Sequence, residues 1–447
     1  MEKKISELQK EQIEKSEYPV VGAKYNNEYK NLDEVVSSDG KIELIDINSK
    51  EGMKIYRRTL IFIMGMAFSK IYPEALLTVN YQLSHSMFCE IENMEVTEEV
   101  IENVTKKMKE LILAQLPIEK KVMNRKEAQE FFDKTKTIKG KLQLDLKTNK
   151  EIKMYFCQDY YNYFYGMLAS NTKFLNLFEI VKYDNGFLIK YPSSKNPLEI
   201  AKDKENKKLA WSLNEYDDLH KVLGVNTVYK LNKAIEENRI KDVIMLDEAL
   251  HEKKIALIAD EIARRKNTKM VLIAGPSSSG KTTFAQRLGI QLKINGLKPV
   301  TISVDNYFVE RKDTPKDKDG NYDFESIEAI DLNLFNDHLT KLLNGEEIEM
   351  PEFDFHVGTK RYKGKKMRLE EDQILVIEGI HCLNDRLTAK IPKENKFKIY
   401  ISALTVLNMD YFNRISTTDN RLVRRIVRDY KFRGYSAIHT LKSWASV

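Results

Sequence analysis

The first half of the chain mixes two periods of apolar residues. Some segments repeat apolar positions at helical spacing, and others alternate them with polar residues as strands do. The order helix, hairpin, helix, strands indicates an α+β domain over residues 51–225. Residues 1–50 are polar with short alternating patches, which predicts a small β-containing segment. Within the α+β domain we expect a helix at 54–71, a hairpin at 76–92, a helix at 97–115 and strands within 150–192.

The second half has a different pattern, in which short apolar runs alternate with helical segments. Residues 226–266 predict helices and are interpreted as a helical linker. Over residues 267–447, each apolar run is followed by a stretch with helical period. Such alternation predicts an α/β domain with a doubly wound parallel sheet, whose ligands bind at the carboxyl ends of the strands. The expected strands are residues 271–274, 300–304, 374–377 and 397–401.

Composition excludes several classes of protein. The chain has 447 residues and a net charge of +6, from 73 basic and 67 acidic residues, which does not require a nucleic-acid partner. Its three cysteines, Cys89, Cys157 and Cys382, are too widely spaced for a disulfide framework or a zinc cluster. No apolar signal core follows the first residue, and the most apolar stretch, 60–68, is too short to span a bilayer. We therefore expect a cytoplasmic protein with no membrane partner.

The first predicted strand of the α/β domain runs into a glycine-rich loop. Gly275 and the run Gly280-Lys281-Thr282 have the spacing G-x-x-x-x-G-K-[ST]. Both glycines are expected to adopt backbone angles that a side chain would forbid, so that N–H groups turn toward phosphate oxygens. A helix expected at 283–294 presents its positive end to the same anion. The expected phosphate-binding residues are Gly275, Pro276, Ser277, Ser278, Ser279, Gly280, Lys281, Thr282 and Thr283.

Acidic residues follow two other predicted strands. Asp305 comes just after the second strand, where a carboxylate can accept a proton from an attacking hydroxyl. A helix-capping role explains the same aspartate equally well. Glu378 ends the third strand, where it can hold magnesium as a Walker-B carboxylate does, together with the Thr282 hydroxyl.

A cluster of arginines follows the fourth predicted strand. On a helix, Arg421, Arg424, Arg425 and Arg428 share one face. Guanidinium groups so close together repel one another unless an anion lies between them, and phosphoryl transfer needs such a clamp. The alternative is a solvated basic face. The basic run at 360–368 is interpreted as a solvated hairpin.

Residues 268 to about 440 resemble the uridine kinase and phosphoribulokinase family of P-loop kinases. The resemblance rests on several motifs in the family's order, namely Gly275 to Thr282, Asp305-Asn-Tyr-Phe308, Asp323, Pro351-Glu-Phe-Asp-Phe355, Glu378-Gly379 and Arg421 to Gly434. It implies an ATP- and Mg²⁺-dependent kinase that transfers the γ-phosphate to a primary hydroxyl. In uridine kinases this is the 5′-hydroxyl of uridine or cytidine.

The resemblance also implies roles for single residues. Asp305 would be the general base, and Lys281 would lie against the phosphates in the catalytic centre. Arg425, Arg428 and Arg433 would be lid arginines on the ATP phosphates, and Thr282 with Glu378 would bind magnesium. The acceptor would be bound by Asp323, Tyr307, Phe353 and His356.

The sequence departs from the uridine kinase pattern at the acceptor pocket. Phe353 replaces a tyrosine, and Gly358 stands where a histidine is expected. A kinase for another small hydroxyl compound, such as a sugar phosphate, is therefore an alternative. A nucleotide-sensing RNA-binding protein with vestigial catalysis is another. Because the family has further helices and a last strand beyond the arginines, we expect an incomplete domain at 267–447.

Residues 54 to about 195 resemble the second additional domain of threonyl-tRNA synthetase, and residues 1–50 the small TGS-like segment before it. The resemblance maps a His-x-x-x-His pair onto Arg58 and Phe62, and a Cys-x-x-x-His pair onto Cys157 and Tyr161. We therefore expect neither editing nor zinc chemistry. The aromatic residues of 155–165 are interpreted as strand packing, with base stacking as the alternative. The expected partner is a small nucleoside-like acceptor; RNA is not favoured, and homo-oligomerisation is left open.

Overall fold

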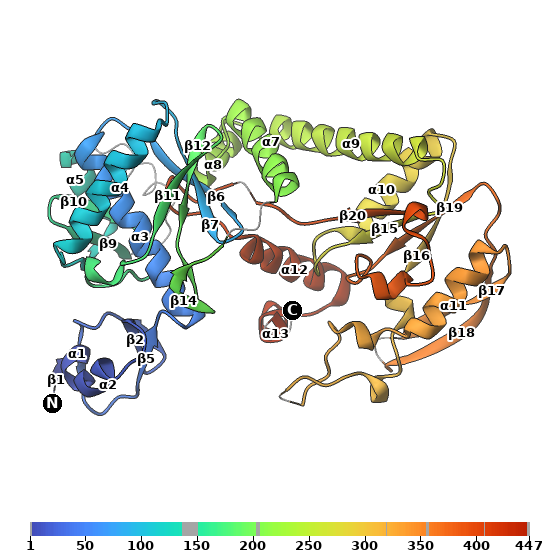
Figure 1. Cartoon of the computed structure of the whole chain (residues 1–447), viewed down its shortest axis with the longest axis horizontal. Helices are drawn as coiled ribbons and strands as arrows, with labels where there is room; N and C mark the ends of the chain where they lie inside the picture. The colour runs from blue at the N-terminus through green and yellow to red at the C-terminus, as the bar shows by residue number, and fades with distance from the viewer. Residues whose placement is uncertain are drawn as a thin grey trace. The chain divides into compact units, whose positions relative to one another are not determined.

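The computed structural model describes residues 2–135, 151–202, 206–318, 320–354, 357–405 and 407–444. It divides into two compact units (Figure 1). The first comprises residues 1–240 and 405–415, and the second 241–404 and 416–447. The chain therefore returns to the first unit between strand β20 (Lys396–Tyr400) and helix α12 (Thr417–Arg433).

The start of the first unit has the β character that its alternating patches predicted. Strand β2 pairs with two antiparallel neighbours, β3 and β5, and β1 pairs with β4. The elements are β1 (Glu2–Lys4), α1 (Ile5–Leu8), α2 (Lys10–Glu14), β2 (Val20–Tyr25), β3 (Glu28–Lys30), β4 (Val35–Ser37) and β5 (Ile42–Asp46).

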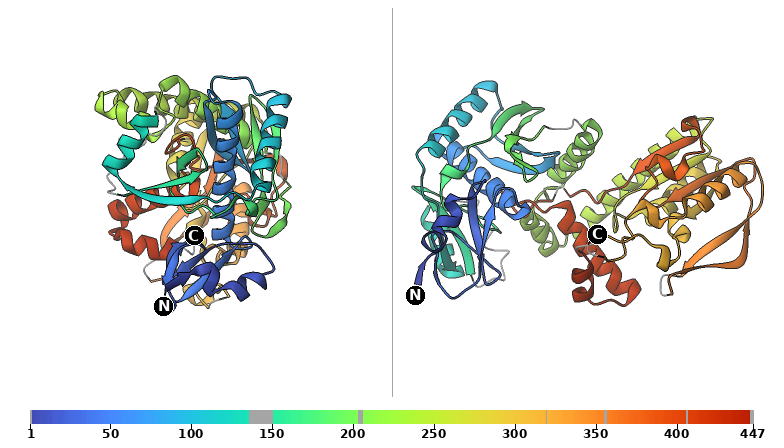
Figure 2. Two further views of the ribbon diagram at one scale, coloured as in Figure 1. Left: turned by 90° about the vertical axis from the view of Figure 1, so that its left-hand side faces the viewer. Right: turned by 60° about the horizontal axis from the view of Figure 1, so that its bottom comes forward.

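Two helices and an antiparallel sheet form the main core of the first unit. Helix α3 (Lys50–Ile71) begins at Ser49, whose hydroxyl accepts a hydrogen bond from the Gly52 amide. It packs beside helix α4 (Glu98–Leu113) (Figure 2), which buries the six apolar residues that its period predicted. The four-stranded sheet has the order β11-β12-β7-β6, with β6 (Leu77–Leu83), β7 (Ser86–Ile91), β11 (Glu179–Tyr183) and β12 (Gly186–Lys190). The predicted α+β architecture is confirmed.

A smaller antiparallel sheet in the same unit contains the aromatic run. Its strands β8 (Glu119–Asn124), β9 (Glu151–Cys157) and β10 (Tyr160–Tyr163) are covered by helix α5 (Arg125–Thr135). Tyr155 and Tyr163 are buried, as strand packing predicted, whereas Tyr165 is half exposed. The unit also contains η1 (Thr172–Phe174), β13 (Pro192–Ser193), β14 (Asn196–Ile200), α7 (Lys207–Leu223) and α8 (Val228–Glu236).

Residues 405–415 are held in the first unit by a buried polar network. Asp410 accepts hydrogen bonds from the Tyr163 hydroxyl over 3.0 Å and from the Asn413 side-chain amide over 2.9 Å. Phe412 lies in the main core of this unit. Burial raises the pKa of Asp410, and its several donors oppose that rise. The segment leading to helix α12 is therefore anchored on both apolar and polar contacts.

The second unit is built on a parallel sheet, as the alternating pattern predicted. Its strand order is β16-β19-β15-β20, and all three pairings are parallel. The strands besides β20 are β15 (Met270–Ala274), β16 (Lys298–Ser303) and β19 (Gln373–Glu378). Since side chains alternate along a strand, Leu272 packs on one face of the sheet and Val271 on the other.

Helices cover both faces of this sheet. Helices α9 (Ile240–Arg264) and α10 (Lys281–Ile294) pack on the Val271 face, and α11 (Leu332–Leu343) on the Leu272 face. Ile255, Ala259 and Ile262 of α9 are buried there, so much of the predicted linker belongs to this core. The basic run at 360–368, interpreted as a hairpin, falls in a single strand, β18 (Thr359–Met367), which pairs antiparallel with β17 (Ile348–Asp354) (Figure 2). None of the described helices combines the length with the hydropathy that a membrane-spanning segment requires.

Candidate active site

The loop between β15 and α10 uses its two glycines in different ways. Gly280 has φ +102°, a conformation that favours glycine, as expected. Gly275 has no positive φ, which corrects the expectation for this position. A Cβ atom on Gly275 would lie 2.2 Å from the Ile401 carbonyl oxygen, so close backbone approach excludes a side chain. Ser278 adopts the second left-handed conformation of the loop, with φ +63°.

The same loop has polar atoms with no protein partner. The Oγ atoms of Ser278 and Ser279 are buried and make no hydrogen bond within the described residues. An unpaired buried hydroxyl is costly, so such atoms call for a ligand. Helix α10 begins at Lys281 and adds the positive end of its dipole. The residues present fit a bound phosphate group.

Three side chains meet at the carboxyl ends of β15, β16 and β19. The Thr282 hydroxyl lies 3.3 Å from Glu378 Oε1, and the Ser303 hydroxyl donates to the same oxygen over 3.0 Å. The structure thus brings together the two residues expected at magnesium. Sequence reasoning missed Ser303, although its place at the end of a strand next to β19 could have indicated it. Burial, and then the charge of Asp305, raise the pKa of Glu378.

The Thr282 and Glu378 side chains suit a magnesium ion that shares its ligands with a bound nucleotide, rather than a metal ion that is held by protein ligands alone. Among the described residues there is no group of three or more His, Cys, Asp or Glu side chains able to hold a metal ion. Magnesium usually takes one or two protein oxygens and completes its shell with phosphate oxygens and water. The Thr282 hydroxyl and the Glu378 carboxylate are suited to such a shared site.

Lys281 and Asp305 are electrostatic neighbours in this site. Surrounding protein lowers the pKa of Lys281, and the charges of Glu378 and Asp305 oppose this effect. Desolvation also raises the pKa of Asp305, although the residue as a whole is exposed; the positive charges of Lys281 and Arg433 oppose the rise. A side chain in a concave site can be reached by water while protein displaces much of its hydration. A carboxylate with a raised pKa is suited to accept a proton.

The predicted arginine face of helix α12 contacts the phosphate-binding loop directly. Arg421 Nε donates to the Ser277 carbonyl over 3.1 Å, and Arg424 Nε donates to the Ser278 carbonyl over 3.1 Å. The Arg425 guanidinium lies 3.3 Å from Ser277 Oγ. Three of the four clustered arginines are thus placed at the loop.

Arg428 and Arg433 lie around a buried carboxylate instead. Asp429 is 3% exposed, and its Oδ1 lies 2.8 Å from Arg428 and 3.7 Å from Arg433. Arg425 reaches the other oxygen of Asp429 over 3.5 Å. The nearby arginines lower the pKa of Asp429 against the effect of its burial. Sequence reasoning missed this organising residue, because an aspartate inside a basic helix gives no signal by itself.

The residues predicted to bind the acceptor differ in their burial and in their hydrogen-bond partners. Tyr307 is fully buried, and its hydroxyl lies 3.1 Å from His338 Nδ1. Phe353 is 7% exposed and packs on the Phe308 ring. Asp323 accepts hydrogen bonds from the amides of the turn that follows it, and is half buried. His356 lies outside the described residues.

Sequence comparison finds relatives for the second unit. The sequence profile of the Phosphoribulokinase / Uridine kinase family matches residues 270–447. A uridine kinase from Mycoplasma genitalium is 30% identical over 178 residues, which cover 40% of this chain and 74% of that protein. The uridine kinase of Bacillus subtilis is 27% identical over 182 residues, or 41% and 77% of the two chains. A solved Bacillus stearothermophilus structure, described as a possible uridine kinase, aligns with TM-score 0.29 and 20% identity over 43% of this chain and 93% of that one.

The second unit is therefore a P-loop kinase domain. The chain belongs to the phosphoribulokinase and uridine kinase family through residues 270–447. Residues 1–269 lie outside the matched region. The resemblance of residues 51–225 to a synthetase domain stays a prediction.

Proposed function

We propose that this chain is an ATP-dependent kinase that transfers the γ-phosphate to the primary 5′-hydroxyl of a nucleoside of the uridine or cytidine type. The observation that carries the proposal is the convergence of Lys281, Asp305 and the Thr282–Glu378 pair at the carboxyl ends of neighbouring parallel strands. The relatives named above are uridine kinases, which supports the nucleoside as acceptor.

Each residue of the site has a role in this reaction. Asp305 accepts the proton of the attacking hydroxyl as the new O–P bond forms. Lys281 and the loop amides stabilise the negative charge that moves from the γ- to the β-phosphate. Arg421, Arg424 and Arg425 of helix α12 hold the loop in place through its carbonyl oxygens and the Ser277 hydroxyl. Magnesium, held by Thr282 and Glu378, would neutralise charge on the phosphate oxygens.

The acceptor pocket favours a second candidate, a kinase for another small hydroxyl compound such as a sugar phosphate. Phe353 supplies no hydroxyl, and the Tyr307 hydroxyl is directed to His338 in the interior. Neither can donate to a base in this arrangement. A substrate that needs fewer polar contacts around its ring fits these two side chains.

A substrate panel tests both candidates. ADP release would be measured with purified full-length protein, Mg²⁺ and ATP, across nucleosides and sugar phosphates. We expect turnover with uridine or cytidine, and a loss of about a hundredfold or more in kcat for Asp305→Asn, because general-base catalysis contributes that much. Turnover of sugar phosphates alone would select the second candidate. An Asp305→Asn variant with unchanged kcat would contradict the assignment of Asp305 as the general base.

A further inference from the structure

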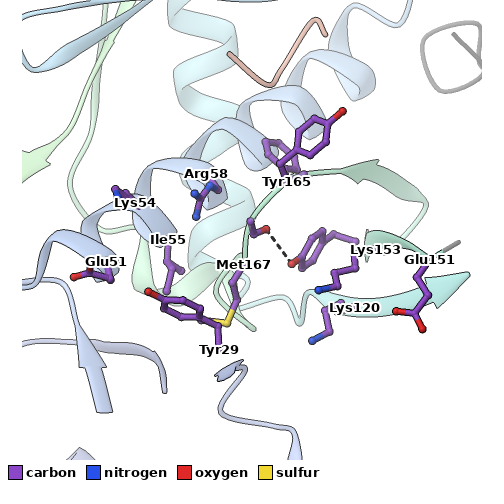
Figure 3. Close-up of a pocket in the computed structure, with 13 residues that line it drawn as sticks. Tyr29, Glu51, Lys54, Ile55, Arg58, Lys120, Glu151, Lys153, Tyr165 and Met167 are labelled. Atoms are coloured by element: carbon purple, nitrogen blue, oxygen red, sulfur yellow. Dashed lines mark hydrogen bonds between the residues drawn. The ribbon is translucent and has the colours of Figure 1, made fainter. Parts of the chain in front are cut away.

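A cavity of about 440 Å³ lies within the first unit, where the kinase residues do not reach. Its volume is in the range of small-molecule sites. Figure 3 shows its lining, which comes from helix α3, strands β8 and β9, the 164–167 segment that follows β10, and strand β3. The side chains that line the cavity indicate which class of ligand it can bind.

The helical wall is one continuous face of α3. Glu51, Lys54, Ile55 and Arg58 are spaced i, i+3, i+4 and i+7, so all four line the cavity together. Lys54 is exposed and makes no ion pair within the part of the chain that the structure describes. The Arg58 guanidinium lies so close to Gly166 that a Cβ atom there would meet Arg58 Cζ at 2.3 Å. Because residue 166 is a glycine, the Arg58 guanidinium has room to lie in the cavity lining.

The sheet wall adds two lysines on one face. Lys120 lies opposite Tyr155 in the antiparallel β8–β9 pairing, and Lys153 is two residues from Tyr155, so all three share a face. Lys120 has a partner, Glu34, at 2.6 Å. Lys153 is exposed and has no ion pair among the described residues. In Figure 3, both lysines are directed toward the space beside Met167. Lys153 is therefore the lysine of this face whose charge a bound anion can pair.

Aromatic side chains complete the wall. Tyr29 and Tyr165 are each 49% exposed, although the Lys24 ammonium lies 5.3 Å from the Tyr29 ring centroid and the Tyr165 ring packs edge-on against Tyr163. Tyr155 is buried, and its hydroxyl donates to the Gly166 carbonyl over 3.1 Å, which fixes the chain beside Arg58. Stacking of a nucleobase on such a ring contributes about 1–3 kcal/mol per base. The lining also contains two carboxylates: Glu51 is three residues from Lys54 on α3, and Glu151 is two residues from Lys153 on β9, on the same face and beside the two sheet lysines in Figure 3.

We propose that this cavity is a second ligand site of the protein, for a nucleotide phosphate. The phosphate would lie among Lys54, Arg58 and Lys153, and the base against Tyr29 or Tyr165. A free mononucleotide and the end of an RNA strand share this chemistry. The site does not depend on the kinase reaction, because its residues all belong to the first unit.

The test uses the full-length chain carrying Lys281→Ala, which weakens nucleotide binding in the second unit equally in every sample. AMP, UMP, inorganic phosphate and a short single-stranded RNA are titrated by calorimetry. Lys54→Ala with Lys153→Ala is the test variant. Lys121→Ala is the matched control, since Lys121 is on the same strand as Lys120 and the opposite face. Lys153→Arg retains the charge, and circular dichroism checks the fold.

We expect the test variant to bind mononucleotides about tenfold or more weakly, since it loses hydrogen bonds to a charged group. Lys121→Ala and Lys153→Arg should bind as the parent does. A photoreactive 8-azido-AMP should label a peptide within residues 151–167 or around Tyr29. RNA binding that is lost in the test variant, without mononucleotide binding, would identify a strand end as the ligand. Equal affinity in all variants, or inorganic phosphate binding as tightly as AMP, would overturn the proposal.

Discussion

The Nε atom of Arg421 donates a hydrogen bond to the carbonyl oxygen of Ser277 over 3.1 Å. Because a peptide unit is planar and trans, this bond also directs the Ser278 N–H away from Arg421. Helix α12 therefore sets the orientation of a peptide in the phosphate-binding loop. The arginines act on the loop's backbone as well as through their charge.

Replacing Arg421 with alanine should weaken ATP binding. The variant loses a hydrogen bond from a charged donor, which is worth about 1.5–3 kcal/mol, so the KM for ATP should rise about tenfold or more. Steady-state kinetics with varied ATP would measure this. Lys431→Ala, an exposed position on the same helix, is the control and should leave KM unchanged. A KM for ATP that is equal in both variants would contradict the assigned role.

Gly275→Ala should be much more harmful than Gly289→Ala. At Gly275 the new Cβ would lie 2.2 Å from the Ile401 carbonyl oxygen, whereas at Gly289 the nearest atom is 3.7 Å away. Backbone displacement of this kind costs about 1–3 kcal/mol, whereas alanine within α10 should stabilise the helix by about 0.5–1 kcal/mol. Thermal unfolding of both variants would show opposite shifts in Tm. A neutral Gly275→Ala variant would contradict the close approach.

The rate should fall as pH is lowered through the raised pKa values of Asp305 and Glu378. Both carboxyls act as anions, and loss of hydration raises the pKa of each, so they become protonated at a higher pH than fully hydrated carboxyls do. The Ser303 hydroxyl opposes the rise at Glu378. Ser303→Ala should therefore move the acid limb of kcat/KM to higher pH.

The profile of kcat/KM against pH would be measured for the wild type and Ser303→Ala. Ser38→Ala changes an exposed hydroxyl in the first unit and serves as the control. An acid limb that moves to lower pH in Ser303→Ala, or stays in place, would contradict the assigned hydrogen bond.

Phe412→Ala should destabilise the first unit, although residue 412 lies beyond the strands of the kinase sheet. Phe412 is 8% exposed and belongs to the core that also contains Phe62 and Phe164. Removing a buried phenyl ring costs about 3–5 kcal/mol. Hydrogen exchange should show faster exchange in helix α3 and no change in strand β15. Tyr430→Ala, at a 73% exposed position, is the control and should leave both segments unchanged.

Local pattern was sufficient for much of the fold. The helical period of residues 97–115 predicted the buried face of α4 residue by residue, since a regular helix repeats its exposure. The apolar runs predicted the four parallel strands, and the glycine-rich spacing predicted the phosphate-binding loop. In each case a few neighbouring residues determine the local backbone, and nothing distant is needed.

Contacts between distant segments had to come from the tertiary structure. Ser303 joins Thr282 and Glu378 only because β16 pairs with β19, and Asp429 gathers arginines that the sequence had assigned to the phosphates. The return of residues 405–415 to the first unit, and the cavity lined by Lys54 and Lys153, likewise join segments far apart in sequence. The sequence by itself determined the elements and the loop chemistry, because these follow from local period and residue type. The tertiary structure alone decided which side chains share a site, because that depends on strand order and packing across the chain.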